Sequence, residues 1–174
     1  YTMDKLEQDV TDLIDASGAK SVLLVGHDWG AALAWSYAMH GARPIERLIT
    51  MNCPHPVLFQ RGLRHLEQLR RSWYMFFFQL PWLPERSVRA QNFRAIEAGL
   101  RGWAVHKQHF SDADMAVFRA NASEPGALTG MINWYRGMPF SLSAMQKRGP
   151  KKIKAPTLFI WGEQDRALGK EMTR

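Results

Sequence analysis

The chain has 174 residues with a formal net charge of +7, and 46% of them are hydrophobic and 22% charged. This length suits one ordinary domain, and the composition is that of a globular protein. A single cysteine, Cys53, excludes an internal disulfide and favours the cytoplasm as the compartment. No apolar run approaches the length of a membrane span, and no secretion signal opens the chain. Because the chain begins without Met and directly in a helical pattern, we expect a fragment of a longer protein.

The positive charge gathers in two stretches, residues 61–71 and residues 147–152. Neither stretch carries a nucleic-acid recognition motif or interleaved stacking aromatics. We therefore interpret them as a solvated helix face and a solvated linker, and we expect no nucleic-acid partner. The oligomeric state has no signature in the sequence.

The first fifty residues alternate between helical and strand patterns. Apolar residues at helical spacing predict a helix that Gly18 caps at its C-terminal end. Four elements follow from the pattern: a helix over 3–14, a strand over 21–25, a helix over 31–40 and a strand over 45–51. The last three form a βαβ unit, whose two strands should be parallel.

From residue 52 the pattern becomes helical, aromatic and rich in proline. Helices are predicted over 64–78, 88–100, 112–120 and 126–136, and the strand pattern returns at 157–162. An all-helical insertion between two pieces of a parallel sheet is typical of a lid. We therefore expect an α/β fold in three parts: a core over 1–54, a lid over 55–148 and a second core part over 149–174. The aromatic stretch 73–82 fits an apolar pocket under the lid, although a self-contained helical core explains it almost as well.

A carboxylate stands at the tip of the turn between the first strand and its helix, in Gly26-His27-Asp28-Trp29-Gly30. Gly-x-nucleophile-x-Gly is the pattern of a nucleophile elbow, a sharp turn whose flanking residues must be small. A carboxylate is ionised at neutral pH and attacks a saturated carbon directly, which forms an ester without an activating base. The helix N-terminus favours its anionic form. The alternative is an aspartate that merely caps the helix.

Five segments in this order resemble the epoxide hydrolases of the α/β-hydrolase superfamily. They are the elbow at 26–30, Asn52-Cys53-Pro54-His55-Pro56, the segment 74–81, Asn133-Trp134-Tyr135-Arg136 and Trp161-Gly162-Glu163-Gln164-Asp165. The resemblance implies a partial α/β-hydrolase fold with an inserted helical lid. It also implies a hydrolase acting on ether bonds, which converts an epoxide and water into a vicinal diol.

The resemblance further implies roles for individual residues. Asp28 is the nucleophile, Tyr74 and Tyr135 grip the epoxide oxygen, and Asp165 is the charge-relay acid. The expected substrate-binding residues are Trp29, Trp134 and Phe78. Trp29 follows the nucleophile, so its backbone N–H is a candidate oxyanion donor. We expect no metal and no organic cofactor, because the nucleophile is intrinsic and the sequence has no ligand cluster.

The tyrosine pair distinguishes two enzyme activities that both use an aspartate nucleophile in this turn. Ring opening places alkoxide charge on oxygen, which phenols can hydrogen-bond or protonate. Haloalkane dehalogenases share the elbow but expel a halide, which needs N–H donors and no proton. A second alternative is a non-catalytic ligand-binding protein on the same scaffold.

The six histidines all precede Asp165, whereas the base of the resembled family follows the acid. His27 adjoins the nucleophile. Because neighbours on a strand point to opposite faces, we expect its ring not to reach the water that hydrolyses the ester. His55 lies in a Pro-His-Pro turn, which indicates a structural role. We therefore expect the catalytic histidine and a His-Gly-x-Pro segment to lie outside these 174 residues.

Overall fold

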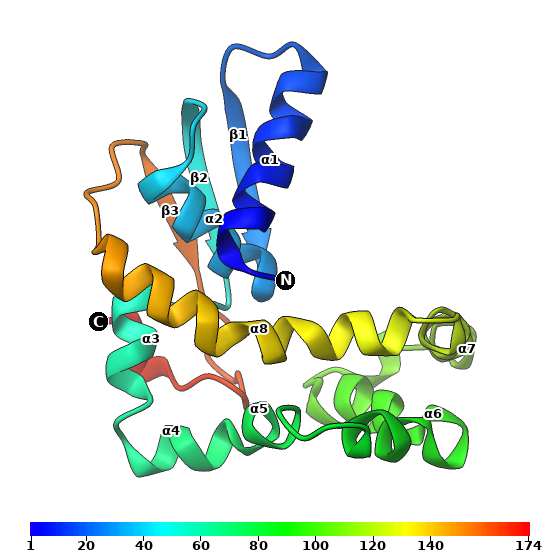
Figure 1. Cartoon of the computed structure of the whole chain (residues 1–174). Helices are drawn as coiled ribbons and strands as arrows, with labels where there is room; N and C mark the ends of the chain where they lie inside the picture. Colours follow the sequence, from blue (N-terminus) through cyan, green and yellow to red (C-terminus); the bar gives the residue numbers. More distant parts are fainter. The chain divides into compact units, whose positions relative to one another are not determined.

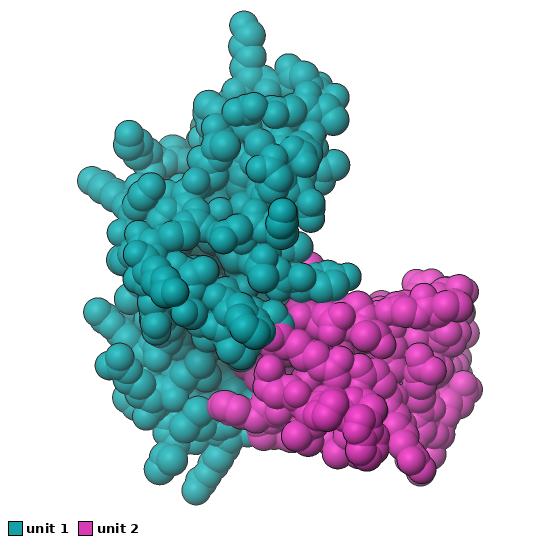
Figure 2. Space-filling model, in the orientation of Figure 1, with its two compact units in different colours: residues 1–72, 137–174 teal, residues 73–136 magenta.

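The computed structural model describes all 174 residues, which form two compact units. Unit 1 comprises residues 1–72 and 137–174, and unit 2 comprises residues 73–136; Figure 2 shows them in teal and magenta. Among the helices, none combines the length and apolar character that a membrane span requires.

A three-stranded parallel sheet forms the centre of unit 1, with the strand order β1-β2-β3 (Figure 1). The pairing register places Val25 opposite Ile49, and Ile49 opposite Leu158. The prediction of a parallel βαβ unit is therefore confirmed. In chain order the elements of this unit are α1 (Met3–Ser17), β1 (Val22–His27), α2 (Trp29–His40), β2 (Ile45–Met51), α3 (Pro56–Gly62), α4 (Leu66–Arg71), the second part of α8 (Ala127–Arg148), β3 (Thr157–Ile160) and the 3₁₀ helix η2 (Lys170–Thr173).

The hydrophobic core of unit 1 lies between α2 and one face of the sheet. Ala34 and Trp35 of α2 pack with Leu48 of β2, and all three are buried. Leu24 of β1 and Phe159 of β3 pack against this core. Because side chains alternate along a strand, the residues next to them in sequence point to the other face of the sheet. On that face Leu23 and Leu158 expose more than half of their surface in the described chain. Because Leu24 packs against this cluster, the core holds β1 and α2 together, and with them the turn that joins them.

A buried polar network joins α1 to α2 and to the second part of α8. Glu7 of α1 accepts a hydrogen bond from Ser36 of α2, and Arg148 of α8 donates to the same carboxylate at 2.9 Å. The chain before α1 also packs closely on α8, because a Cβ added to Gly137 of α8 would lie 2.0 Å from the Tyr1 carbonyl oxygen. The prediction that this helix ends at residue 136 is wrong, since α8 continues past Pro139 to Arg148. These contacts with α1 offset the hydrogen bond that proline removes.

The regular elements of unit 2 are all helices, and two predicted helices that extend into it differ from those observed. It contains α5 (Trp73–Phe77), α6 (Leu83–Trp103), the 3₁₀ helix η1 (Lys107–His109), α7 (Asp112–Ser123) and the first part of α8. The helix predicted over 64–78 is divided into α4 and α5 at Ser72. The helix predicted over 88–100 is interrupted, because Gln91, Asn92 and Phe93 have positive φ and leave the right-handed helix. By contrast α7 begins where predicted, at a capping box formed by Ser111 and Asp114.

Candidate active site

Asp28 occupies the turn between β1 and α2 in a conformation that non-glycine residues rarely adopt. Its φ is 53° and its ψ is −123°, and such a conformation costs about 1–3 kcal/mol unless the surroundings hold it. Its backbone N–H donates to the Met51 carbonyl at 3.1 Å, and its own carbonyl accepts from Ala31 and Ala32. The end of β2 and the first turn of α2 therefore clamp Asp28 in this position.

The two glycines of the elbow differ in what surrounds them. A Cβ on Gly26 would lie 2.4 Å from the carbonyl oxygen of Gly30, so only glycine fits there. A Cβ on Gly30 would meet no atom of the described chain within 4 Å. The expectation that both flanking residues must be small is therefore confirmed at Gly26 alone. At Gly30 the first turn of α2 is oriented so that an added Cβ would point into open space.

Asp165 follows β3 and lies in a loop that directs hydrogen-bond donors at its carboxylate. One carboxylate oxygen accepts from Asn52 Nδ2 at 2.7 Å. The other accepts from the backbone N–H groups of Ala167 and Leu168, at 2.8 and 2.9 Å. These are charge-assisted hydrogen bonds, which fix the orientation of the carboxylate. None of them comes from a histidine.

Asn52 links the ends of two strands, a role that the sequence pattern did not predict. It follows β2 with a φ of 48° and donates its backbone N–H to the Ile160 carbonyl of β3. Its side-chain oxygen accepts from Gly162 N at 3.2 Å, while its nitrogen donates to Asp165. Asparagine tolerates positive φ better than most residues, and its place directly after a strand was the available indication.

The pKa values of Asp28 and Cys53 are both raised at the carboxyl ends of the strands. Asp28 is exposed by surface area, but the protein atoms packed around its carboxyl group displace hydration and raise its pKa. The Asp165 charge raises this pKa further, whereas His27 and the Trp29 backbone N–H lower it. The favourable effect expected from the helix N-terminus is therefore present at Trp29 but is outweighed by lost hydration. Burial, aided by both carboxylates, raises the pKa of Cys53 to about 12 and keeps it a neutral thiol.

His55 has a structural environment, as its Pro-His-Pro context predicted. Its Nδ1 atom accepts from the backbone N–H of Val57, and its ring lies edge-on to Trp35 at 5.3 Å between centroids. The Trp35 indole N–H in turn donates to the Cys53 carbonyl at 3.0 Å. Burial lowers the pKa of His55, so the neutral ring is favoured. The core tryptophan thus holds the turn that follows Asn52.

Within unit 2, Tyr74 and Tyr135 lie together although 61 positions separate them in the sequence. Their rings meet edge-on with centroids 5.7 Å apart. Phe78 lies against both rings, at 6.1 Å from Tyr74 and 4.8 Å from Tyr135. The predicted phenol pair and one predicted substrate-binding residue therefore form one aromatic cluster. Trp134 is half-buried beside them in sequence, but successive helix residues point about 100° apart, so it faces another direction.

Polar contacts fix the part of α8 that carries Tyr135. Gln79 donates to the Tyr135 carbonyl at 2.7 Å. Arg136 forms two hydrogen bonds with the Glu85 carboxylate, at 2.6 and 3.0 Å, and a third with the Leu80 carbonyl. Arg136 accordingly holds the pKa of Glu85 below its usual value. These contacts tie α8 to the chain around the start of α6.

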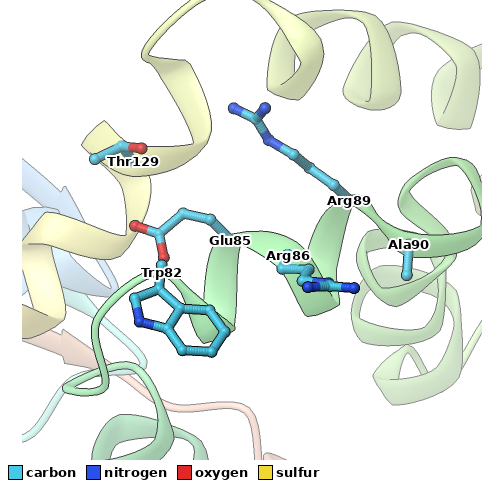
Figure 3. A pocket seen from close by; sticks show the side chains of 6 residues that line it. All are labelled: Trp82, Glu85, Arg86, Arg89, Ala90 and Thr129. Carbon is cyan, nitrogen blue, oxygen red and sulfur yellow. The ribbon is translucent and has the colours of Figure 1, made fainter.

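A cavity of about 780 Å³ in unit 2 contains none of the predicted site residues. Figure 3 shows the indole of Trp82 and the carboxylate of Glu85 on one side, with Arg86 and Arg89 extending from α6. Ala90 and Thr129 complete the lining. The expected substrate-binding role of Trp29, Trp134 and Phe78 therefore stays a prediction. Across the described chain no group of three or more His, Cys, Asp or Glu side chains could hold a metal ion.

The sequence of this chain is similar to known proteins along nearly its whole length. The family profile for the alpha/beta hydrolase fold matches residues 1–174. Epoxide hydrolase 3 of Mus musculus is 37% identical over 97% of the chain and 45% of its own length. Epoxide hydrolase 4 of Homo sapiens is 34% identical over 99% of the chain and 48% of its own length. The chain thus spans about half the length of these relatives.

Among solved structures, an epoxide hydrolase of Bacillus megaterium in complex with an inhibitor superposes with a TM-score of 0.81. It is 28% identical, and the match covers 99% of this chain and 62% of that chain. The aspartate elbow, the tyrosine pair and the acid loop thus occur in a chain that resembles epoxide hydrolases along nearly its whole length.

Proposed function

Because this chain belongs to the α/β-hydrolase fold family, we propose that it carries the nucleophile, the oxygen donors and the acid of an epoxide hydrolase. The substrate is a small-molecule epoxide, the second reactant is water, and the product is a vicinal diol. The resemblance to epoxide hydrolases of mouse and human supports this substrate class.

The observation that carries the proposal is a carboxylate in the strained elbow after β1. In the first step one Asp28 oxygen attacks an epoxide carbon, the C–O bond of the ring breaks, and a hydroxyalkyl ester forms on the enzyme. The positive φ of Asp28 supports this role, since strained backbone gathers at functional sites. An Asp that only capped α2 would accept hydrogen bonds in an ordinary extended conformation.

The second observation concerns the oxygen that leaves carbon in that step. It gains a full negative charge and needs a proton, which Tyr74 and Tyr135 are suited to supply. Their ring centroids lie 5.7 Å apart in one aromatic cluster, which supports a shared role for the two phenols. We assign Phe78, which contacts both phenol rings, to the apolar lining around the substrate, and the Trp29 backbone N–H to the charge on the ester oxygen.

Hydrolysis of the ester needs a base that activates water. We propose a histidine for this role, oriented by Asp165, whose fixed carboxylate would stabilise the imidazolium form. Three hydrogen bonds from Asn52, Ala167 and Leu168 support this assignment, because an orienting acid must itself be held.

Mass spectrometry of the protein expressed from its complete reading frame tests the proposal. The protein is mixed with styrene oxide, quenched with acid within milliseconds and digested. The expected result is a peptide containing residue 28 heavier by the mass of the epoxide, with the adduct absent from Asp28→Ala. Tyr37→Phe, a change in the core remote from the elbow, serves as the matched control and retains the adduct.

Two other outcomes would replace the proposal. Release of halide from a haloalkane, with no loss on changing both tyrosines to phenylalanine, would indicate a dehalogenase. Tight binding of an epoxide without any adduct on Asp28 would indicate a non-catalytic ligand-binding protein.

A further inference from the structure

Gln68 of α4 is fully buried, with 0% of its surface exposed, and the proposed chemistry does not use it. A buried side-chain amide is costly unless its polar atoms find partners. Gln68 satisfies this requirement across about a hundred residues of sequence. Its Nε2 atom donates to the Ala167 carbonyl at 2.9 Å, and its Oε1 atom accepts from Gly169 N at 3.0 Å.

The two backbone groups that Gln68 binds belong to the loop that carries the acid. Asp165 accepts from Ala167 N and Leu168 N. The backbone N–H of Ala167 therefore binds Asp165, while its carbonyl oxygen binds Gln68. The Nε2 atom of Gln68 thus holds the peptide unit between residues 167 and 168, whose N–H donates to the carboxylate, and Oε1 holds the next peptide unit. A shift of this loop would move the donors and the acid together.

The remaining contacts make the amide orientation unambiguous. The second hydrogen of Nε2 is directed to Ser72 Oγ, at 2.9 Å, and Ser72 is also fully buried. Close packing of the chain beyond the loop adds to this: a Cβ on Gly62 of α3 would lie 2.3 Å from Met172 Sδ of η2. The acid loop is therefore fixed to α3 and α4 by polar contacts at residues 167 and 169 and by apolar packing at residue 172.

We propose that Gln68 is the positioning residue of the acid loop, which holds Asp165 at the orientation needed to activate the hydrolytic base. This inference rests on the proposed function and deepens its second step. Gln68 has no part in ester formation, which depends on Asp28 and the tyrosines. Its loss should therefore affect one half-reaction and spare the other.

The test measures the two half-reactions separately in the full-length protein by rapid quench with styrene oxide. Gln68→Met keeps the side-chain volume and removes both hydrogen bonds to the acid loop, together with the one to Ser72. We expect ester formation at the wild-type rate and ester breakdown slowed about 10- to 100-fold, the scale of a misplacement near 1 Å. The acidic limb of the pH profile for breakdown should move to lower pH, because a displaced carboxylate stabilises the imidazolium less.

The matched control is Thr11→Val, which also removes buried hydrogen bonds within unit 1, one to the Glu7 carbonyl of α1 and one to the Tyr37 hydroxyl of α2. It should lower the midpoint of urea unfolding and leave ester breakdown unchanged. If Gln68→Met does not fold, Gln68→Glu has the same shape, keeps an acceptor for Gly169 N and loses the donor to Ala167. Unchanged breakdown and pH profile in the folded variant would overturn the inference. If the wild type forms no ester, the proposed function itself fails.

Discussion

Replacing Gly26 by alanine tests whether the elbow has the steric origin that the structure indicates. The new Cβ would lie 2.4 Å from the Gly30 oxygen and 2.7 Å from Ala31 Cα, where ordinary contacts begin near 3.4 Å. The obstructing atoms are backbone, so α2 must retreat from β1 by about 1 Å. Overpacking of this kind costs about 1–3 kcal/mol, and a shift of the nucleophile by about 1 Å costs about 100-fold in rate.

Gly30→Ala is the matched control, because the same atom is added four residues away and meets nothing within 4 Å. Alanine is also the better helix former by up to about 1 kcal/mol. Urea unfolding and steady-state epoxide hydrolysis are measured on both variants of the full-length protein. Gly26→Ala should lose stability and activity, and Gly30→Ala should keep both. Equal behaviour of the two variants would refute the steric explanation.

Three further predictions concern single side chains of the site. Asp28→Asn should abolish turnover yet raise the free energy of unfolding at neutral pH. The folded pKa of Asp28 is raised, so its ionisation opposes folding as pH rises through that pKa. The stability gained by Asp28→Asn should therefore vanish in strong acid, where wild-type Asp28 is protonated. Urea unfolding of both proteins at neutral pH and in strong acid checks this. Tyr135→Phe should slow ester formation about 100-fold or more in rapid-quench experiments while Tyr74 is intact, and an unchanged rate would argue against a proton donor. Glu85→Gln should cost about 1 kcal/mol at neutral pH, since its pairing with Arg136 is partly solvated. Because the folded pKa of Glu85 is lowered, wild type and variant should converge as pH falls through it, which urea midpoints across the acid range measure.

The sequence predicted best where local and tertiary forces agree. The β1–α2–β2 unit has strand and helix patterns of the right period and glycines at its turns, and it folds as predicted. The elbow is recognisable for the same reason, because a tight strand-to-helix turn restricts residue types within five positions. The strain at Asp28 agrees with this reading.

Elements that depend on distant contacts could not be predicted in the same way. Pro139 indicates a helix end, yet α8 continues because Ser141 and Arg148 bind α1. Positive φ at residues 91–93 breaks α6 without any glycine or proline to mark it. The partners of Gln68 lie about a hundred positions away, so no local pattern indicates its role.

A single turnover in water enriched in ¹⁸O tests the central claim, an ester between Asp28 and substrate, most directly. Enzyme in excess over styrene oxide is allowed one turnover, and the diol and the peptide containing residue 28 are weighed separately. If Asp28 is the nucleophile, the new diol oxygen comes from its carboxylate. The diol should then carry no label and the peptide should gain one ¹⁸O atom. Label in the diol after the first turnover, with none in the peptide, would contradict the ester and the role of Asp28.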